Sequence, residues 1–518
     1  MKISAEAWSA RAVSLFEPGR NCASVVEAGR VSLLVDAEAY FRALRAACIE
    51  ARESILVLGW DFNSRTRLDH GEPAGRDAPP PGLGEFLNWL AKRRRGLRIH
   101  VLIWDFPMVF GAAREWPPIF GFGWRAHRRV KVRYDNTHPP GGSQHQKIVV
   151  IDDAVAFCGG IDLTARRWDS CSHPAQDARR IWDGKPYAPY HDVMAMVDGE
   201  AAAALGEVAR ERWRAATGRT LAAPAPARGA DRWPGEVTPQ MTGALTAIAR
   251  TIPETHPLGE AREVQALFLD MIAAAKDVIF IENQYFTSER LGDALARRLA
   301  EDDPPEVVVV TRLLSHGWLE AGTMETLRTG LVRKLRDADH KGRFGIYTPH
   351  VAGLEQGTCV DVHSKVTVVD DQWLRVGSAN FSNRSMGFDT ECDVAFEAGG
   401  NRAHRTAIRE FRDGLIAEHL GVPVDEWRAA LAAQGSLHAA IRRLQREDRT
   451  LKPLEDLPEP VAAMSAVAAV GDPERPVSLD LLVEQFSSDD AASGPARRGP
   501  AWGTIAAFGV AALAFALA

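Results

Sequence analysis

The chain has 518 residues, which favours two domains with extensions over a single domain. Its 46% hydrophobic and 25% charged residues are typical of a globular protein with enough apolar side chains for two cores. The formal net charge of −6 argues against a general nucleic-acid binder, which usually has a basic surplus. We therefore expect no nucleic-acid partner.

The six cysteines show neither C-x-x-C pairing nor zinc-ligand spacing, and several lie in apolar contexts. This pattern favours reduced, buried thiols and a cytoplasmic protein over a disulfide framework. The first residues, Met1 to Glu6, lack the apolar core of a secretory signal.

The first predicted helix begins at Asp36, whose side chain can cap its N-terminus. Apolar residues with helical spacing form its buried face: Tyr40, Phe41, Leu44, Ala47 and Cys48. Residues 54–59 then predict a buried strand that ends in Trp60-Asp61, and residues 97–104 predict the next strand.

The second half repeats this order of elements. The matching helix face consists of Val264, Leu267, Phe268, Met271 and Ile272. A strand over residues 277–281 follows and leads into Asn283-Gln284, and residues 306–310 correspond to residues 97–104. Strands that alternate with helices predict α/β layers around a largely parallel sheet.

Ligands of such sheets bind beside the strand ends. Trp60, Asp61, Asn283 and Gln284 are therefore candidate substrate-binding residues, with a turn or packing role as the alternative. Composition divides the chain into two similar lobes and a tail: residues 20–220 and 240–425 as lobes, 426–450 as a helical extension, 451–500 as a flexible linker, and 501–518 as an apolar segment.

Residues 501–518 carry no charge and follow Arg497-Arg498. Their length is the lower limit for a membrane span, and the two arginines would stay on the cytoplasmic side. We expect this segment to attach the protein to the cytoplasmic face of the inner membrane. The alternatives are a C-terminal helix packed on the protein and a disordered apolar tail.

Each half contains the same cassette, H-x-K-x(4)-D followed by two small residues and an Asp or Asn. The first copy comprises His145, Lys147, Asp152, Gly159-Gly160 and Asp162, and the second comprises His363, Lys365, Asp370, Gly377-Ser378 and Asn380. Two copies of so long a pattern are not expected by chance. They indicate one composite site to which each half supplies a histidine and a lysine.

A histidine and a lysine two positions apart on a strand face the same side. If the two faces meet, one neutral imidazole can attack phosphorus to form a phosphohistidine, and the other can protonate the leaving alkoxide and then activate water or an alcohol. Lys147 and Lys365 would neutralise the non-bridging oxygens, so we expect neither a metal nor another cofactor. Asn380 can donate a hydrogen bond to the phosphate, whereas ionised Asp162 cannot.

A nucleophilic imidazole also needs an acceptor on its second nitrogen. Asp192 and Glu391 follow the two cassettes, and we expect them to orient the histidines, with a structural role as the alternative. Asp152 and Asp370 lie at the predicted strand turns, which favours a structural role. Ser378, among the small residues of the second cassette, is a further candidate substrate-binding residue.

These motifs resemble those of the phospholipase D superfamily, and the resemblance extends over roughly residues 32–420. The branch shared by bacterial and eukaryotic phospholipases D is indicated by further matching segments: Gly159 to Leu163, Arg167 to Asp169, His191-Asp192, Ile281 to Phe286, Gly377 to Asn380 and Asn383 to Ser385. The resemblance implies two α/β lobes related by a pseudo-twofold axis, with one site between them and metal-independent chemistry. It also implies that His145 is the nucleophile and His363 the acid. The lipid-targeting modules of eukaryotic members are not recognised ahead of the first motif.

The leading functional hypothesis is hydrolysis of a phospholipid to phosphatidic acid and a head-group alcohol by a monomeric enzyme, with transfer to another alcohol as a further capacity. Aromatic residues between Phe106 and Trp124, followed by Arg125, Arg128 and Arg129, suit a membrane surface, although a buried helix is the alternative. A phosphatidyltransferase resembling cardiolipin synthase is the second hypothesis. A nuclease of the same superfamily and a catalytically inactive scaffold are less favoured.

Overall fold

The computed structural model describes residues 14–71, 75, 77–105, 124–225, 231–315, 321–455 and 471–475. The elements of the N-terminal half are β1 (Ser24–Val35), α1 (Asp36–Glu50), β2 (Ser54–Gly59), α2 (Leu83–Arg93), β3 (Arg98–Trp104), β4 (Val130–Asp135), β5 (Ile148–Ile151), β6 (Val155–Gly159), β7 (Ile181–Trp182), β8 (Lys185–Pro186), β9 (Tyr190–His191), β10 (Val193–Gly199) and α4 (Glu200–Thr217).

The elements of the C-terminal half are β11 (Met241–Ile252), β12 (Ala261–Arg262), α5 (Glu263–Ala274), β13 (Val278–Asn283), α6 (Glu289–Leu299), β14 (Glu306–Val310), a π-helical turn (Ala321–Glu325), α8 (Thr326–Ala338), β15 (Phe344–Val351), β16 (Asp361–Val362), β17 (Lys365–Val369), β18 (Trp373–Gly377), α9 (Asn383–Gly387), β19 (Glu391–Glu397), α10 (Arg402–Leu420), α11 (Val424–Gln434), α12 (Leu437–Arg443) and β20 (Arg449–Pro453).

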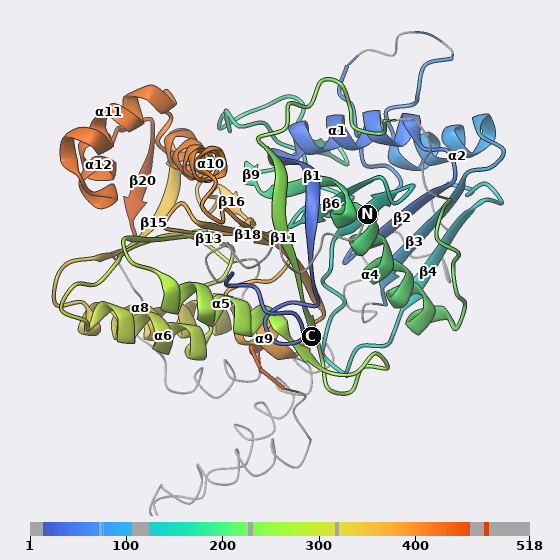
Figure 1. The fold of residues 1–518 in the computed structure, drawn as a ribbon. Helices are drawn as coiled ribbons and strands as arrows, with labels where there is room; N and C mark the ends of the chain where they lie inside the picture. The colour runs from blue at the N-terminus through green and yellow to red at the C-terminus, as the bar shows by residue number, and fades with distance from the viewer. Residues whose placement is uncertain are drawn as a thin grey trace, which may run out of the picture.

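One large sheet runs through both halves and confirms the α/β fold class (Figure 1). Outward from the middle, the N-terminal half has the strand order β1-β10-β6-β5-β2-β3-β4 and the C-terminal half has β11-β19-β18-β17-β13-β14-β15. The halves join where β1 pairs antiparallel with β11. The order of corresponding strands is therefore the same on both sides of this junction.

The prediction of a largely parallel sheet is wrong. Within the large sheet, parallel pairing is confined to the strands β2-β3-β4 and β13-β14-β15, and the strands between these two groups pair antiparallel. The reason lies in the cassettes, whose strands β5-β6 and β17-β18 are joined by turns too short for a parallel crossover. Asp152, Asp153, Asp370 and Asp371 adopt positive φ angles of 50–54° in these turns.

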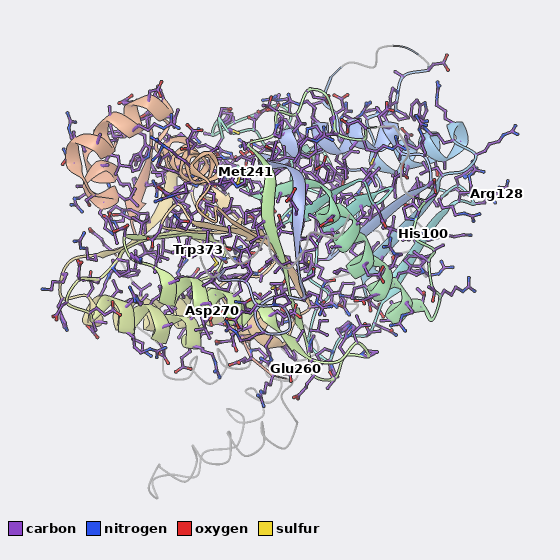
Figure 2. The ribbon with its side chains drawn as sticks, viewed as in Figure 1. His100, Arg128, Met241, Glu260, Asp270 and Trp373 are labelled. Carbon is purple, nitrogen blue, oxygen red and sulfur yellow. The ribbon has the colours of Figure 1, made fainter. Side chains whose placement is uncertain are left out.

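Helices cover both faces of the sheet (Figure 1). In the N-terminal half, α1 and α2 pack on one face and α4 packs on the other. In the C-terminal half, α5, α6 and α8 cover one face, whereas α10, α11 and α12 cover the face that shares its core with α4. Met241 lies on the middle strand β11, and Arg128 lies at the outer edge of the N-terminal half (Figure 2).

The predicted capping role of Asp36 is wrong. Asp36 is the first residue of α1, has a φ of +64° and makes no capping hydrogen bond. Its side chain is fully buried and lies against His173 and His191 instead. Contacts with these distant residues therefore override the local capping preference.

The described C-terminal residues also differ from the expected extension and linker. Residues 451–453, assigned to the linker, belong to β20, which pairs with β15 and buries Leu451. Farther along, Asp472 accepts hydrogen bonds from Thr287 Oγ1 at 2.7 Å and from the backbone N–H of Arg384 at 2.8 Å.

No helix in the described part of the chain is long and apolar enough to cross a membrane. This finding contradicts the expectation that the protein is attached to the inner membrane. Residues 501–518, on which that expectation rested, lie outside the described residues, as do residues 106–123 of the aromatic segment that was predicted to end at Trp124.

Candidate active site

The two cassette histidines lie on segments that each pair with the opposite half. The backbone N–H of His145 donates to the carbonyl of Thr390 at 2.9 Å, and the backbone N–H of His363 donates to the carbonyl of His191 at 2.8 Å. Glu391 and Asp192 are the next residues along the chain. The backbone register therefore brings each histidine beside the carboxylate that follows the other half's cassette.

The side chains complete this crossed arrangement. His145 Nδ1 lies 3.0 Å from Glu391 Oε2, and His363 Nδ1 lies 2.7 Å from Asp192 Oδ2. An acceptor on Nδ1 holds the proton there, which leaves the lone pair of Nε2 for a substrate. The two predicted orienters are thus in contact with the two histidines, each across the junction between the halves.

Both carboxylates are held by further hydrogen bonds. Glu391 accepts from Ser378 Oγ at 2.5 Å and from Ser385 Oγ at 2.7 Å. Asp192 accepts from the Tyr190 hydroxyl at 3.0 Å. Ser378 was expected to contact the substrate, but it is fully buried and its hydroxyl donates to Glu391, so it positions the carboxylate.

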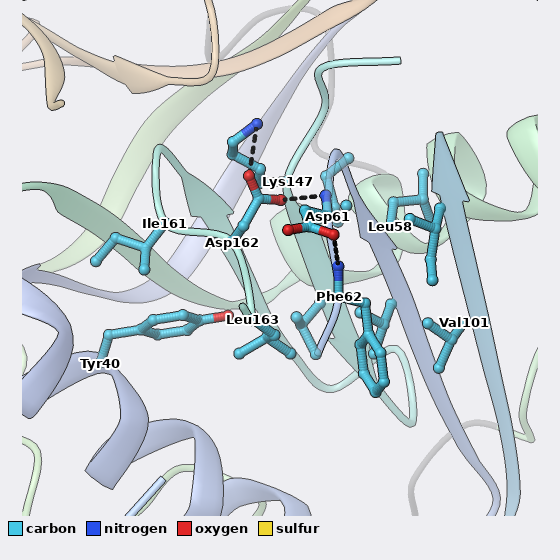
Figure 3. A pocket seen from close by; sticks show the side chains of 14 residues that line it. Tyr40, Leu58, Asp61, Phe62, Val101, Lys147, Ile161, Asp162 and Leu163 are labelled. Carbon is cyan, nitrogen blue, oxygen red and sulfur yellow. Dashed lines mark hydrogen bonds and ion pairs between the residues drawn. The ribbon is translucent and has the colours of Figure 1, made fainter. Parts of the chain in front are cut away.

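Each cassette lysine donates to the backbone carbonyl of its own cassette histidine, but the other partners of the two lysines differ. Lys147 Nζ forms an ion pair with Asp162 Oδ2 at 3.2 Å, in a small pocket that also contains Asp61 (Figure 3). Lys365 Nζ donates to Gln284 Oε1 at 3.1 Å and to the backbone carbonyl of His363. The Asp-for-Asn difference between the cassettes therefore gives the two lysines unequal charge compensation.

Burial lowers the pKa of His145 and of His363 well below 6.5, and the charges of Lys147 and Lys365 lower both further. Burial also lowers the pKa of Lys365 to about 7. Burial raises the pKa of Glu391 to about 8, with Asp389 contributing in the same direction. At neutral pH the free site therefore contains uncharged imidazoles, a Lys365 side chain that is only partly protonated and a Glu391 carboxyl that is largely protonated.

The residues at the strand ends differ in their access to this site. Gln284 contacts the site by accepting a hydrogen bond from Lys365. Asn283 is fully buried, and its side-chain oxygen accepts from the backbone N–H of Phe381 at 3.0 Å. Trp60 stacks on Trp104 with ring centroids 5.5 Å apart. Asp61 accepts from Thr164 Oγ1 at 2.7 Å and from the backbone N–H of Phe62 at 2.9 Å.

Asn380 lies on the loop after β18, where its backbone N–H donates to Ser385 Oγ at 3.0 Å. Its buried side-chain oxygen has no hydrogen-bond partner among the described residues. Asp152 and Asp370 bind backbone instead: Asp152 accepts from residues 52, 53 and 54, and Asp370 from residues 276, 277 and 278. These contacts tie each cassette turn to the start of the neighbouring strand.

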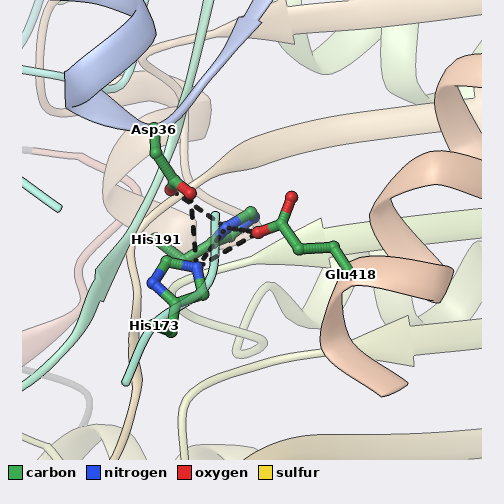
Figure 4. Close-up of side chains that lie close together, drawn as sticks. All are labelled: Asp36, His173, His191 and Glu418. Carbon is green, nitrogen blue, oxygen red and sulfur yellow. Dashed lines mark hydrogen bonds and ion pairs between the residues drawn. The ribbon is translucent and has the colours of Figure 1, made fainter. Parts of the chain in front are cut away.

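A second cluster of titratable groups includes His191, the residue that precedes Asp192 (Figure 4). Glu418 Oε1 is 3.1 Å from both His173 Nε2 and His191 Nδ1, and Asp36 lies 3.3 Å from the first ring and 3.1 Å from the second. The remaining ring nitrogens also face carboxylates: His173 Nδ1 faces Asp169 and His191 Nε2 faces Glu282, both at 2.8 Å.

Two imidazoles and two carboxylates, with an outer carboxylate behind each ring, are a donor set that could hold a divalent cation. Alternatively, the cluster holds protons on its imidazoles instead of a cation. Burial lowers the pKa of His173, but Asp36, Asp169 and Glu418 have a larger opposite effect and raise this pKa to about 9. The expectation that the protein binds no metal was based on motifs formed by residues close together in the sequence. The four donors come from positions 36, 173, 191 and 418, which share no local spacing.

Three further residues belong to the site and were not predicted from the sequence: Tyr190, Ser385 and Arg167. Tyr190 packs against His363 with ring centroids 5.4 Å apart, and the guanidinium of Arg167 lies 5.0 Å from the Tyr190 ring centroid. All three residues lie in or next to segments that carried the family resemblance. Their position close to the motifs was the signal that could have identified them.

Comparison with known proteins finds a matching family and similar sequences and folds. The family described as "Cardiolipin synthase, PLD-like domain" matches residues 268–413. Phospholipase D A of Dictyostelium discoideum is 25% identical over 76% of this chain and 36% of its own length. Phospholipase D alpha 3 of Arabidopsis thaliana is 23% identical over 73% of this chain and 63% of its own length. The chain thus spans between about a third and just under two thirds of these relatives.

Among solved structures, phosphatidylserine synthase of Haemophilus influenzae has a similar fold, with a TM-score of 0.53 at 10% identity over 89% of this chain and 94% of that one. The relatives indicate an enzyme that acts on phosphodiesters. With its doubled cassette and this shared fold, the chain belongs to the phospholipase D superfamily.

Proposed function

We propose that the protein is a phospholipase D, which hydrolyses a phospholipid to phosphatidic acid and a free head-group alcohol. The observation that carries the proposal is the crossed pairing of His145 with Glu391 and of His363 with Asp192. Each pairing leaves one Nε2 for chemistry, and an in-line displacement needs one nucleophile and one proton donor. The low-identity phospholipase D relatives support the lipid substrate.

In the first step, neutral His145 attacks phosphorus through Nε2 and forms the N–P bond of a phosphohistidine. The P–O bond to the head group breaks, and the alkoxide takes the Nε2 proton of His363, which enters this step as the imidazolium, protonated on both nitrogens. Burial and Lys365 lower the pKa of His363 in the free site, and the negative charge of a bound diester would oppose that shift. Glu391 stabilises the charge that develops on His145.

In the second step, Nε2 of His363 removes a proton from water, whose oxygen attacks phosphorus. The N–P bond breaks, and phosphatidic acid leaves with His145 regenerated. Lys147 and Lys365 offset the charge on the non-bridging oxygens in both steps. The side-chain amide of Asn380 donates to the same phosphate, whereas Asp162 keeps Lys147 in position.

A phosphatidyltransferase similar to cardiolipin synthase is the second candidate, because the family that matches residues 268–413 carries that description. The first step is identical, and an alcohol such as the head group of phosphatidylglycerol replaces water in the second. The two candidates therefore differ in the acceptor that reaches the phosphohistidine.

Purified protein should be incubated with phosphatidylcholine, phosphatidylglycerol or plasmid DNA, each with and without a primary alcohol. Phosphatidic acid from the lipids, with a phosphatidyl-alcohol when the alcohol is present, is the expected result. Cardiolipin from phosphatidylglycerol would favour the transferase, and nicked DNA with inert lipids would contradict both. The His363→Ala variant is the matched control for contaminating lipase activity.

A further inference from the structure

A pocket of about 200 Å³ lies in the N-terminal half, and Arg167 of the candidate active site is one of its lining residues. Its cationic lining consists of Arg65, Arg67, Arg166, Arg167 and Arg179. Asp183 is the one carboxylate among its lining residues, so the lining has a formal charge of +4. This local surplus contrasts with the net charge of −6 of the whole chain.

Two of these arginines are already neutralised. Arg65 pairs with Asp183 at 2.6 Å, and Arg179 pairs with Asp177 at 2.7 Å. Arg67, Arg166 and Arg167 have no carboxylate within salt-bridge distance in the described part of the chain, although Asp61, Asp162 and Asp361 act on Arg167 from farther away. Three guanidinium groups are therefore available to an anion.

Arg167 links this pocket to the catalytic histidines. Its guanidinium lies 5.0 Å from the centroid of the Tyr190 ring, which in turn lies 5.4 Å from that of the His363 ring. The buried Nε of Arg167 has no hydrogen-bond partner among the described residues. A buried guanidinium N–H without an acceptor is unfavourable, and a bound oxyanion would satisfy it.

The remaining lining suits the head group of a lipid. Trp168 and Trp182 are stacked under Arg179 and Arg65, with distances of 4.5 Å and 4.8 Å from the guanidinium carbon to the ring. Next to Trp182 on the β7–β8 hairpin, Ile181 is 51% exposed, which is unusual for a large apolar residue of this protein. Cations and aromatic rings beside an exposed apolar side chain are typical of sites that face a lipid–water interface.

We propose that this pocket selects phospholipids whose head-group alcohol carries a negative charge of its own, such as a second phosphate. The inference rests on the proposed function, because the acid His363 marks the side from which the head group leaves. Arg167 extends from that side into the pocket, and Arg67 and Arg166 bind the terminal anion. Guanidinium groups match a phosphate with paired, charge-assisted hydrogen bonds.

The kinetic test compares phosphatidylinositol 4-phosphate with phosphatidylinositol, each dilute in neutral detergent micelles so that surface charge is constant. The wild-type kcat/KM should be at least about tenfold higher for the phosphorylated lipid, since one charge-assisted contact contributes about 1.4 kcal/mol or more. Arg67→Gln and Arg166→Gln should each reduce this ratio several-fold. Arg95→Gln removes the same charge at an exposed position outside the pocket and should leave the ratio unchanged.

A wild-type ratio near one, or a ratio that Arg67→Gln and Arg166→Gln do not change, would overturn the proposal. If Arg167→Lys lowers kcat/KM equally for both lipids, Arg167 serves the reacting phosphate and its assignment to the head group is wrong.

A calorimetric binding arm separates failure of the pocket from failure of the proposed function. Inositol 4-phosphate should bind the full chain, inositol should not, and Arg166→Gln should weaken binding several-fold even if no lipid is hydrolysed. Inorganic phosphate that binds as tightly as inositol 4-phosphate would overturn the head-group assignment in favour of a free-phosphate site.

Discussion

Glu391, in the C-terminal half, holds Nδ1 of His145, in the N-terminal half, at 3.0 Å. Asp192 and His363 repeat the relationship in the opposite direction at 2.7 Å. Each half therefore contains a histidine whose orienting carboxylate belongs to the other half. Among the described residues, neither cassette histidine has its orienting carboxylate in its own half, so both halves are needed to complete the two pairs.

The pairing of His145 with Glu391 predicts how activity depends on pH. Nδ1–H of a nucleophilic imidazole needs an ionised acceptor, and burial raises the pKa of Glu391 to about 8. The competent form is the deprotonated one, so kcat/KM should be low at pH 6 and rise as pH increases through about 8. In Glu391→Gln the limb near pH 8 should be absent, and the rise should move toward pH 7, where Asp192 ionises because burial raises its pKa to about 7. Activity at the optimum should be lower by about 10²–10⁴-fold. A variant profile that keeps the limb would show that another group controls it.

The two histidines should differ in a trapping experiment. His145→Ala removes the proposed nucleophile, so no phosphoenzyme should form. His363→Ala removes the proposed acid/base and should let phosphohistidine accumulate with substrates whose head group leaves easily. Mass spectrometry of acid-sensitive, base-stable phosphate on rapidly quenched protein measures both. Phosphoenzyme in His145→Ala but not in His363→Ala would reverse the assignment.

The cluster of Asp36, His173, His191 and Glu418 predicts a bound divalent cation. Protein purified without chelators should contain about one equivalent by elemental analysis, and Glu418→Gln should lower it. Adding Zn²⁺, Mn²⁺ or Ca²⁺ to chelated protein should raise Tm, since saturation at 100 times Kd adds about 2.7 kcal/mol to the free energy of unfolding. Glu254→Gln, an exposed control, should behave as wild type. Metal-free wild type with an unchanged Tm would favour the protonated imidazoles.

Replacement of Asp152 should lower the stability of the protein without changing the catalytic reaction. Its carboxylate accepts from three backbone N–H groups at 2.8 Å and pairs with Arg232 at 2.9 Å. Asp152→Ala should lower the free energy of unfolding by about 2–3 kcal/mol or more, because these donors lose their acceptor. Asp152→Asn keeps one acceptor oxygen and tolerates the positive φ, so its loss should be smaller. Thermal unfolding measures both, and a fall in kcat per folded molecule would contradict a structural role.

Several elements could be predicted because their signals are local. The strands at residues 54–59 and 306–310 are apolar runs of the right length, and the structure contains them as β2 and β14. The apolar face of α1 follows from its helical spacing. The expected capping role of Asp36 was wrong because its side chain contacts His191, which is distant in sequence. Asn283 and Ser378 are buried against Phe381 and Glu391, contacts that local spacing does not reveal.

The sequence by itself determined the α/β class, the doubled cassette and the types of residue at the site, because strand periodicity and motif spacing are properties of neighbouring residues. Tertiary structure alone decided which carboxylate orients which histidine, since that depends on the backbone register between Thr390 and His145 and between His191 and His363. It also decided that positions 36, 173, 191 and 418 converge and that Arg167 extends from a basic pocket toward His363. These relationships join residues up to hundreds of positions apart, where local spacing carries no information about distance.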